Sequence, residues 1–84
     1  MKQTVNVQLE NGLEARNIAM LVQIASQFNS KVYIEAEEKK VNAKSIMGVM
    51  TLALNKGDNL VLLVDGEDEK EACKKLESYL AAKN

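Results

Sequence analysis

Residues 4–28 have the sequence TVNVQLENGLEARNIAMLVQIASQF, and the spacing of their apolar residues changes part-way along. Val5, Val7 and Leu9 alternate with polar residues, which is typical of a strand with one buried face. Asn11-Gly12 interrupts that alternation. From Arg16 onward the apolar residues fall on one side of a helix: Ile18, Leu21, Val22, Ala25 and Phe28. The stretch therefore predicts a strand followed by an amphipathic helix.

The rest of the chain continues this exchange of strands and helices. The other predicted elements are a strand over residues 31–35, a hairpin turn over 35–40, a short strand over 40–43, a helix over 45–54, a strand over 60–64 and a helix from Asp68 with Lys83 in its last turn. The order βαββαβα predicts an α+β fold, a two-layer open-faced sandwich. We expect a mostly antiparallel four-stranded sheet with three helices on one face, in a single domain over residues 1–84.

The composition excludes most catalytic sites. The chain has 84 residues, no histidine and one cysteine, Cys73, which we expect to be a small core residue. Neither a zinc site nor a Cys–His nucleophile can be built from this set. No GxxxxGK or GxGxxG motif is present, and Glu37-Glu38 lies in a charged run typical of a solvated turn. We therefore expect no metal, no cofactor and no enzymatic activity.

Charge and aromatic content also limit the partners. The formal net charge is −1, and the chain has only three aromatic residues, so direct binding of nucleic acid is not expected. No apolar run approaches the roughly 20 residues that span a bilayer, and the start of the chain lacks a signal peptide's apolar core. One cysteine cannot form an internal disulfide, and a cytoplasmic location is expected.

The segment 45–54, SIMGVMTLAL, carries more apolar surface than one face of a helix can bury. At about 100° per residue, two stripes point in opposite directions with Ile46 between them: Val49, Leu52 and Ala53 on one, Met47, Met50 and Leu54 on the other. Only one stripe can face the sheet. The other is either a methionine-rich contact surface or is covered by neighbouring loops.

Ser45 directly precedes this segment, in the position of a helix N-cap. Its hydroxyl is expected to accept a hydrogen bond from the backbone N–H of Met47 or Gly48, and a structural cap is the simpler interpretation. A phosphate on Ser45 would face unpaired N–H groups and the positive end of the helix dipole. Phosphorylation is thus compatible with the predicted fold.

Two segments resemble the HPr family, the small phosphocarriers of the bacterial phosphotransferase system. Residues 41–52, VNAKSIMGVMTL, resemble the region around the regulatory serine, and residues 12–17, GLEARN, resemble the active-site motif Gly-Leu/Ile-His-Ala-Arg-Pro. The predicted element order also matches, so the resemblance covers essentially the whole chain. Glu14 stands where the family has its phosphoryl-accepting histidine, and Asn17 where it has proline.

The resemblance implies an HPr-like regulatory protein without phosphohistidine relay, since the relay needs an imidazole and a carboxylate is a weak nucleophile. It implies that HPr kinase/phosphorylase phosphorylates Ser45 with ATP, and that the product binds catabolite control protein A as a corepressor in carbon catabolite repression. The residues implied in partner binding are Arg16, Met20, Ile46, Met47 and Met50. Arg16 is expected to pair with Glu14, with phosphorylated Ser45 or with an acidic partner, or else to be solvated.

Several alternatives stay open. Glu14 could be an inert replacement, an imperfect mimic of phosphohistidine, or the acceptor of a residual phosphocarrier. The chain could instead be a decoy that occupies the partners of HPr without switching. An ordinary HPr engineered at positions 14 and 17 would have the same sequence. An exposed apolar patch and an edge strand are compatible with a monomer or a weak dimer.

Overall fold

The computed structural model describes residues 1–82, and these form four strands and three helices. The elements are β1 (Lys2–Asn6), α1 (Ala15–Ser26), β2 (Lys31–Ala36), β3 (Lys39–Asn42), α2 (Ile46–Met50), β4 (Asn59–Asp65) and α3 (Glu69–Leu80). The predicted order βαββαβα is confirmed. The sheet order is β1-β4-β2-β3, and every neighbouring pair is antiparallel. The predicted position of Lys83 in the last helical turn lies outside the described residues.

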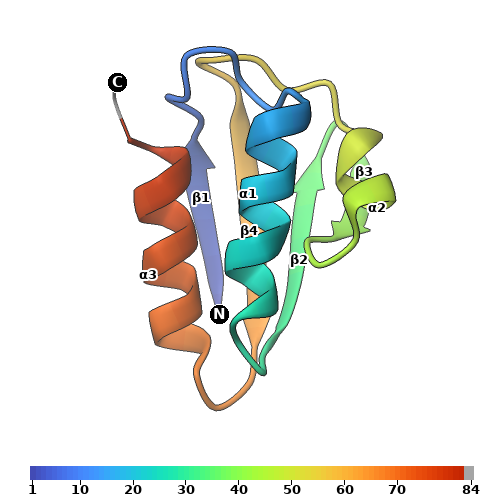
Figure 1. Ribbon diagram of the computed structural model, residues 1–84. Helices are drawn as coiled ribbons and strands as arrows, with labels where there is room; N and C mark the ends of the chain where they lie inside the picture. The colour runs from blue at the N-terminus through green and yellow to red at the C-terminus, as the bar shows by residue number, and fades with distance from the viewer. Residues whose placement is uncertain (83–84) are drawn as a thin grey trace.

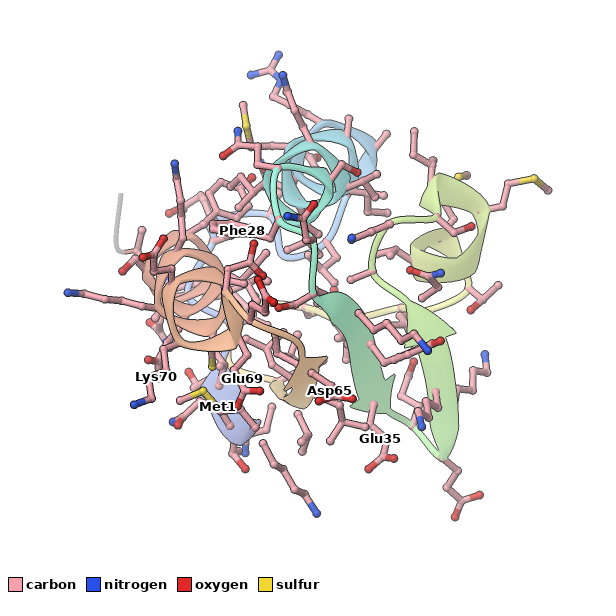
Figure 2. All side chains as sticks on the ribbon, turned by 90° about the horizontal axis from the view of Figure 1, so that it is seen from below. Met1, Phe28, Glu35, Asp65, Glu69 and Lys70 are labelled. Carbon is pink, nitrogen blue, oxygen red and sulfur yellow. The ribbon has the colours of Figure 1, made fainter. Side chains whose placement is uncertain are left out.

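The helices cover one face of the sheet, as predicted. Figure 1 shows α1 and α3 running side by side in front of the strands, with the short α2 beside β3. The end-on view of Figure 2 shows Glu35 projecting from the opposite face, which carries no helix. Of the helices formed by residues 1–82, none combines the length and the apolar character needed to cross a membrane.

The core lies between the sheet and the helices, where one face of each strand meets the apolar helix stripes. In β4, Leu60, Leu62 and Val64 are buried while Val61 and Leu63 between them are half-buried on the other face. This alternation follows from the period of two along a strand. The buried residues of α3 are Ala72, Cys73, Leu76 and Leu80. Burial raises the pKa of the Cys73 thiol, which suits the predicted role of a small core residue.

The first strand ends earlier than the alternation of apolar residues predicts. Val7 and Leu9 are buried as expected, but β1 ends at Asn6. Beyond that point the backbone pairs with a turn and a helix end: the N–H of Val7 donates to the carbonyl of Asp58 (2.8 Å), and that of Gln8 to the carbonyl of Leu80 (2.8 Å). The chain stays extended because these partners replace a neighbouring strand.

The helix predicted over residues 45–54 is much shorter, because α2 ends at Met50. The hydroxyl and the N–H of Thr51 both donate to the carbonyl of Gly48, at 2.7 and 3.2 Å, and this closes the last turn. After it, Leu52 and Leu54 are buried and Ala53 is exposed, which is the alternation of an extended chain. The predicted outward position of Leu54 and the predicted inward position of Ala53 are therefore wrong.

The charged run between β2 and β3 forms a hairpin, as predicted, but the turn itself is only Glu37-Glu38. Both residues have positive φ angles, 53° and 64°. A two-residue hairpin turn with positive φ at both residues matches the twist of the flanking strands. Such turns usually contain asparagine, aspartate or glycine, and glutamate rarely adopts positive φ. The tight turn lets Glu35 and Ala36 pair with Lys40 and Lys39.

Candidate functional site

Ser45 caps α2, as the sequence predicts. The N–H of Gly48 donates to Ser45 Oγ (3.2 Å), and the backbone of Ser45 is extended, as an N-cap residue requires. The N–H of Ser45 donates in turn to the carbonyl of Asn42, the last residue of β3 (3.0 Å). The half-buried Ser45 side chain is thus fixed at the junction of the sheet and the short helix.

Lys44 ties this junction to the end of α1. Its ammonium donates to the carbonyl of Phe28 (2.7 Å), and its N–H donates to Asn42 Oδ1 (2.8 Å). Phe28 itself is partly buried against the core (labelled in Figure 2). The start of α2 is therefore connected to both β3 and α1, so the position of Ser45 is determined by contacts outside its own helix.

The other end of α2 is held by the hairpin between β2 and β3. Lys39 Nζ donates to the carbonyl of Thr51, the C-cap residue of α2 (2.9 Å). A cation is favourable there because the helix dipole is negative at its C-terminus. The N–H of Ala53 donates to Glu37 Oε1 (3.1 Å). Both contacts join residues that are separated by more than ten positions along the chain. Because α2 has only five residues, these tertiary contacts have a large share in keeping it formed.

One side of α2 is an exposed apolar surface. Val49 is fully buried, whereas the large apolar residues on the outside keep substantial exposed fractions: Met47 81%, Met50 60%, Ile46 49% and, on the neighbouring α1, Met20 44%. We call these four residues the α2 patch. Neighbouring loops do not cover it, so that alternative is wrong. Large exposed apolar side chains gathered on one short helix, as Ile46, Met47 and Met50 are, usually mark a contact surface.

Glu14 and Arg16 lie at the start of α1 and are both exposed. Glu14 is the N-cap residue, and its carbonyl accepts from the N–H of Ile18 (2.8 Å), but its carboxylate makes no capping hydrogen bond. Among residues 1–82, Arg16 forms no ion pair, so the pairing with Glu14 is absent. Both charged groups are open to solvent and to partners.

Asn17 has a structural role that the sequence alone did not indicate. Its Nδ2 donates to the carbonyl of Gly12 (2.6 Å), and the hydroxyl of Tyr79 on α3 donates to its Oδ1 (3.2 Å). Burial raises the pKa of Tyr79, which keeps the phenol protonated as a donor. Asn17 therefore fixes the loop before α1. The sequence signal for this contact is weak: it consists of an amide side chain, Asn17, placed five residues after the Asn11-Gly12 turn.

Gly12 brings the loop before α1 against the segment that follows α2. Its φ is +61°, and a Cβ at this position would stand 2.4 Å from the carbonyl oxygen of Leu54. The next N–H, of Leu13, donates to that same carbonyl (2.9 Å). Only glycine fits this approach. The fold thus places the two sequence motifs, residues 12–17 and 41–52, on connected segments.

The titratable groups around the site are few. Residues 1–82 contain no group of three or more Cys, Asp or Glu side chains placed to hold a metal ion. Asp68 accepts hydrogen bonds from Ser30 and Asn29, which lower the pKa of its carboxyl, and it precedes α3 as the N-cap residue rather than lying near α2. The site thus presents the Ser45 hydroxyl beside the exposed side chains of the α2 patch.

The comparison with known proteins agrees with the two motifs. A family model described as the HPr component phosphorylation site of the phosphotransferase system matches residues 1–82. The chain belongs to the HPr family. The HPr-like protein Crh of Bacillus subtilis (strain 168) is 50% identical over 80 residues, which covers 95% of this chain and 94% of that protein.

Solved structures of the HPr family show the same fold. The phosphocarrier protein HPr of Bacillus anthracis superposes with a TM-score of 0.92 at 42% identity, covering 95% of each chain. The crystal structure of Crh from Bacillus subtilis, described as a dimer formed by a swapped domain, has a TM-score of 0.76 at 51% identity and covers 93% of this chain and 90% of that one. This HPr-like chain is thus similar to the phosphocarriers and to Crh.

Proposed function

We propose that this HPr-like chain is a regulatory protein of carbon catabolite repression, rather than an enzyme or a phosphohistidine carrier. HPr kinase/phosphorylase would phosphorylate Ser45, and the product would bind catabolite control protein A as a corepressor. One observation carries the proposal. The Ser45 hydroxyl caps α2, and α2 carries three of the four exposed residues of the α2 patch. The similarity to Crh supports it, as does Glu14 at the position that the resemblance assigns to the histidine.

The proposed modification is an ordinary phosphoryl transfer. Ser45 Oγ attacks the γ-phosphorus of ATP, the bond to the β-phosphate oxygen breaks, ADP leaves, and the hydroxyl proton passes to a base of the kinase. The phosphate adds about −1.5 to −2 charges at pH 7. Because Ser45 already lies at the N-terminal end of α2, the added anion is compatible with the helix and changes mainly the surface.

The α2 patch would then be the surface that the partner binds. Met47 and Met50 offer flexible, polarisable side chains that adapt to an apolar pocket, next to a new anion at Ser45. Arg16, which is exposed and forms no ion pair among residues 1–82, would be free to bind a carboxylate of the partner. A partner that needs both the apolar contact and the phosphate would distinguish the modified protein from the unmodified one.

The proposal includes a cytoplasmic location, where ATP and a transcription regulator are both available. The chain would act as one domain over residues 1–84, as a monomer or a weak dimer, without contacting DNA, a membrane, a metal or a cofactor. The structure of Bacillus subtilis Crh is described as a swapped dimer, so size-exclusion chromatography of this chain at several concentrations is the corresponding measurement.

The test uses two phosphorylation reactions. The protein is incubated with ATP and HPr kinase, and separately with phosphoenolpyruvate and enzyme I, and the modified residue is located by mass spectrometry. We expect phosphate on Ser45 in the first reaction only, and none in Ser45→Ala. Hydroxylamine-sensitive phosphate on Glu14 would support the residual carrier instead.

Binding to catabolite control protein A completes the test. We expect the phosphorylated protein to bind and the unmodified protein not to bind. If no phosphate appears in either reaction and the unmodified protein still binds partners of HPr, the chain is a decoy and the proposed switch is wrong. Glu14→Gln is the control for the charge at position 14, since it keeps the shape of the side chain.

A further inference from the structure

Gly48 is the one glycine of this chain whose backbone does not call for glycine. Gly12, Gly57 and Gly66 all have positive φ, whereas Gly48 lies within α2. A Cβ built at Gly48 would stand 3.5 Å from the carbonyl oxygen of Asn42 and 3.5 Å from Cβ and Oγ of Ser45. These distances are ordinary van der Waals contacts, so the fold has room for a methyl group at this position.

Glycine at this position is also unfavourable for the helix. It is the poorest helix former after proline, and α2 has only five residues. Position 48 is the third residue after the N-cap, but a capping box is not needed there, because the N–H of Ser45 already donates to the carbonyl of Asn42 (3.0 Å). The chain nevertheless lacks a better helix former at this position. A reason outside helix stability is therefore needed.

The space left empty at Gly48 points to that reason, because it borders the Ser45 hydroxyl. We propose that Gly48 is a specificity-determining residue for the phosphorylation of Ser45, an inference that rests on the proposed function. Without a side chain at position 48, the γ-phosphate of ATP can approach Ser45 Oγ, and the phosphate formed there has room. The absence of a carboxylate at this position also avoids repulsion between two anions next to the same oxygen.

Three substitutions separate steric hindrance from charge: Gly48→Ala, Gly48→Gln and Gly48→Glu. We expect all three to fold with a midpoint of thermal unfolding no lower than that of the unchanged protein. We expect kcat/KM for phosphorylation by HPr kinase and ATP to fall about tenfold for alanine, since small misplacements of reacting groups cost this much or more. Glutamine should lower it further, and glutamate most. Thr51→Ala is the control for the stability of α2, because it removes the hydroxyl that donates to the carbonyl of Gly48 without adding atoms near Ser45.

Each outcome decides the inference. If Gly48→Ala unfolds or melts at a lower temperature, the fold itself needs this glycine and the inference is wrong. If the variants fold and are phosphorylated as fast as the unchanged protein, the inference is wrong while the proposed function stands. If the unchanged protein is not phosphorylated on Ser45 at all, the proposed function fails, and this inference fails with it.

Discussion

Individual residues of α2 divide between stability and recognition. Val49 is fully buried and belongs to the core, whereas Met47, two positions earlier, has 81% of its surface exposed. A change at Val49 would leave a cavity, and a change at Met47 would leave the interior untouched. The proposed partner surface can therefore be altered without altering the fold, which makes the function testable by single substitutions.

We predict that Met47→Asp strongly weakens partner binding and leaves stability nearly unchanged. The Met47 side chain is exposed and takes no part in the Ser45 cap, so its replacement should change the free energy of unfolding by about 0.5 kcal/mol or less. A carboxylate in the centre of an apolar contact costs about 2 kcal/mol or more in binding, a loss of at least about 30-fold. Calorimetry with phosphorylated protein and catabolite control protein A measures the second value, and urea unfolding the first.

Asn55→Asp is the matched control for Met47→Asp. It adds the same charge at an exposed position outside the α2 patch, so it should bind like the unchanged protein. If both variants bind equally well, the α2 patch is not the surface that the partner recognises. If both lose binding, the effect of Met47→Asp comes from net charge alone.

Among the elements, α2 shows what the sequence can and cannot predict. Its start was predictable because the Ser45 cap bonds only three residues ahead. Its end was not, because Lys39 and Glu37 reach it from a hairpin more than ten positions earlier in the chain. Extending helical geometry past Met50 therefore misplaced Ala53 and Leu54. Met47 and Met50 lie within α2, where helical geometry does hold, so their predicted position opposite the buried Val49 is correct.

The start of α3 shows the same limit. The helix begins near Asp68, as the sequence predicts; Asp68 occupies the N-cap position, but its carboxylate does not cap the helix. It accepts instead from the N–H of Asn29 (2.8 Å), the N–H of Ser30 (2.9 Å) and the Ser30 hydroxyl, 38 positions or more away. Asp68 thus joins the turn before β2 to the turn before α3. Nothing local in the sequence distinguishes this role from ordinary capping.

We predict a pH-dependent effect of Ser30→Ala. Ser30 is buried, and losing its hydroxyl should lower the free energy of unfolding by about 1 kcal/mol at pH 7. The Ser30 hydrogen bond is the main cause that lowers the pKa of Asp68 below its ordinary 3.8. Since the folded pKa is depressed, this stabilisation is present above pH 3.8 and is lost as the pH falls through the folded pKa.

Urea unfolding from pH 7 down to pH 3 checks this prediction. The difference between Ser30→Ala and the unchanged protein should be constant near neutrality and should shrink below pH 3.8. Ser26→Ala, an exposed serine at the end of α1, should show no such dependence. A difference that stays constant down to pH 3 would mean that the Ser30 hydroxyl does not favour the ionised form of Asp68.

The molecule as a whole connects the two motif segments through the segment that follows α2. Gly12 and Leu13 contact the carbonyl of Leu54, so the loop with Glu14 and the chain leaving α2 are packed together. The sequence predicted the layers and the element order because these follow from apolar periodicity. It did not predict this contact, since a close approach of two loops depends on backbone geometry that no apolar pattern encodes.

Stability of the whole fold comes from apolar burial, with very little from charge pairs. Although 27% of the residues are charged, residues 1–82 form one ion pair, between the N-terminal amine and Glu69 (3.6 Å; both labelled in Figure 2). Both groups are partly exposed, and such pairs contribute about 0–1 kcal/mol. The apolar core, in contrast, includes residues of every helix and of three strands, β1, β2 and β4.

We therefore predict that salt separates stability from recognition in this protein. Raising sodium chloride from 0.05 to 0.5 M shortens the screening length from about 14 Å to about 4 Å. Weakening one exposed ion pair should move the midpoint of thermal unfolding by no more than about 8 °C. Binding of the phosphorylated protein to its partner should weaken severalfold, because the phosphate contact is electrostatic. Glu69→Gln lacks this ion pair, so its midpoint of thermal unfolding should depend on salt even less than that of the unchanged protein. A shift above about 10 °C in the unchanged protein would mean that charges contribute far more to the fold than one ion pair can.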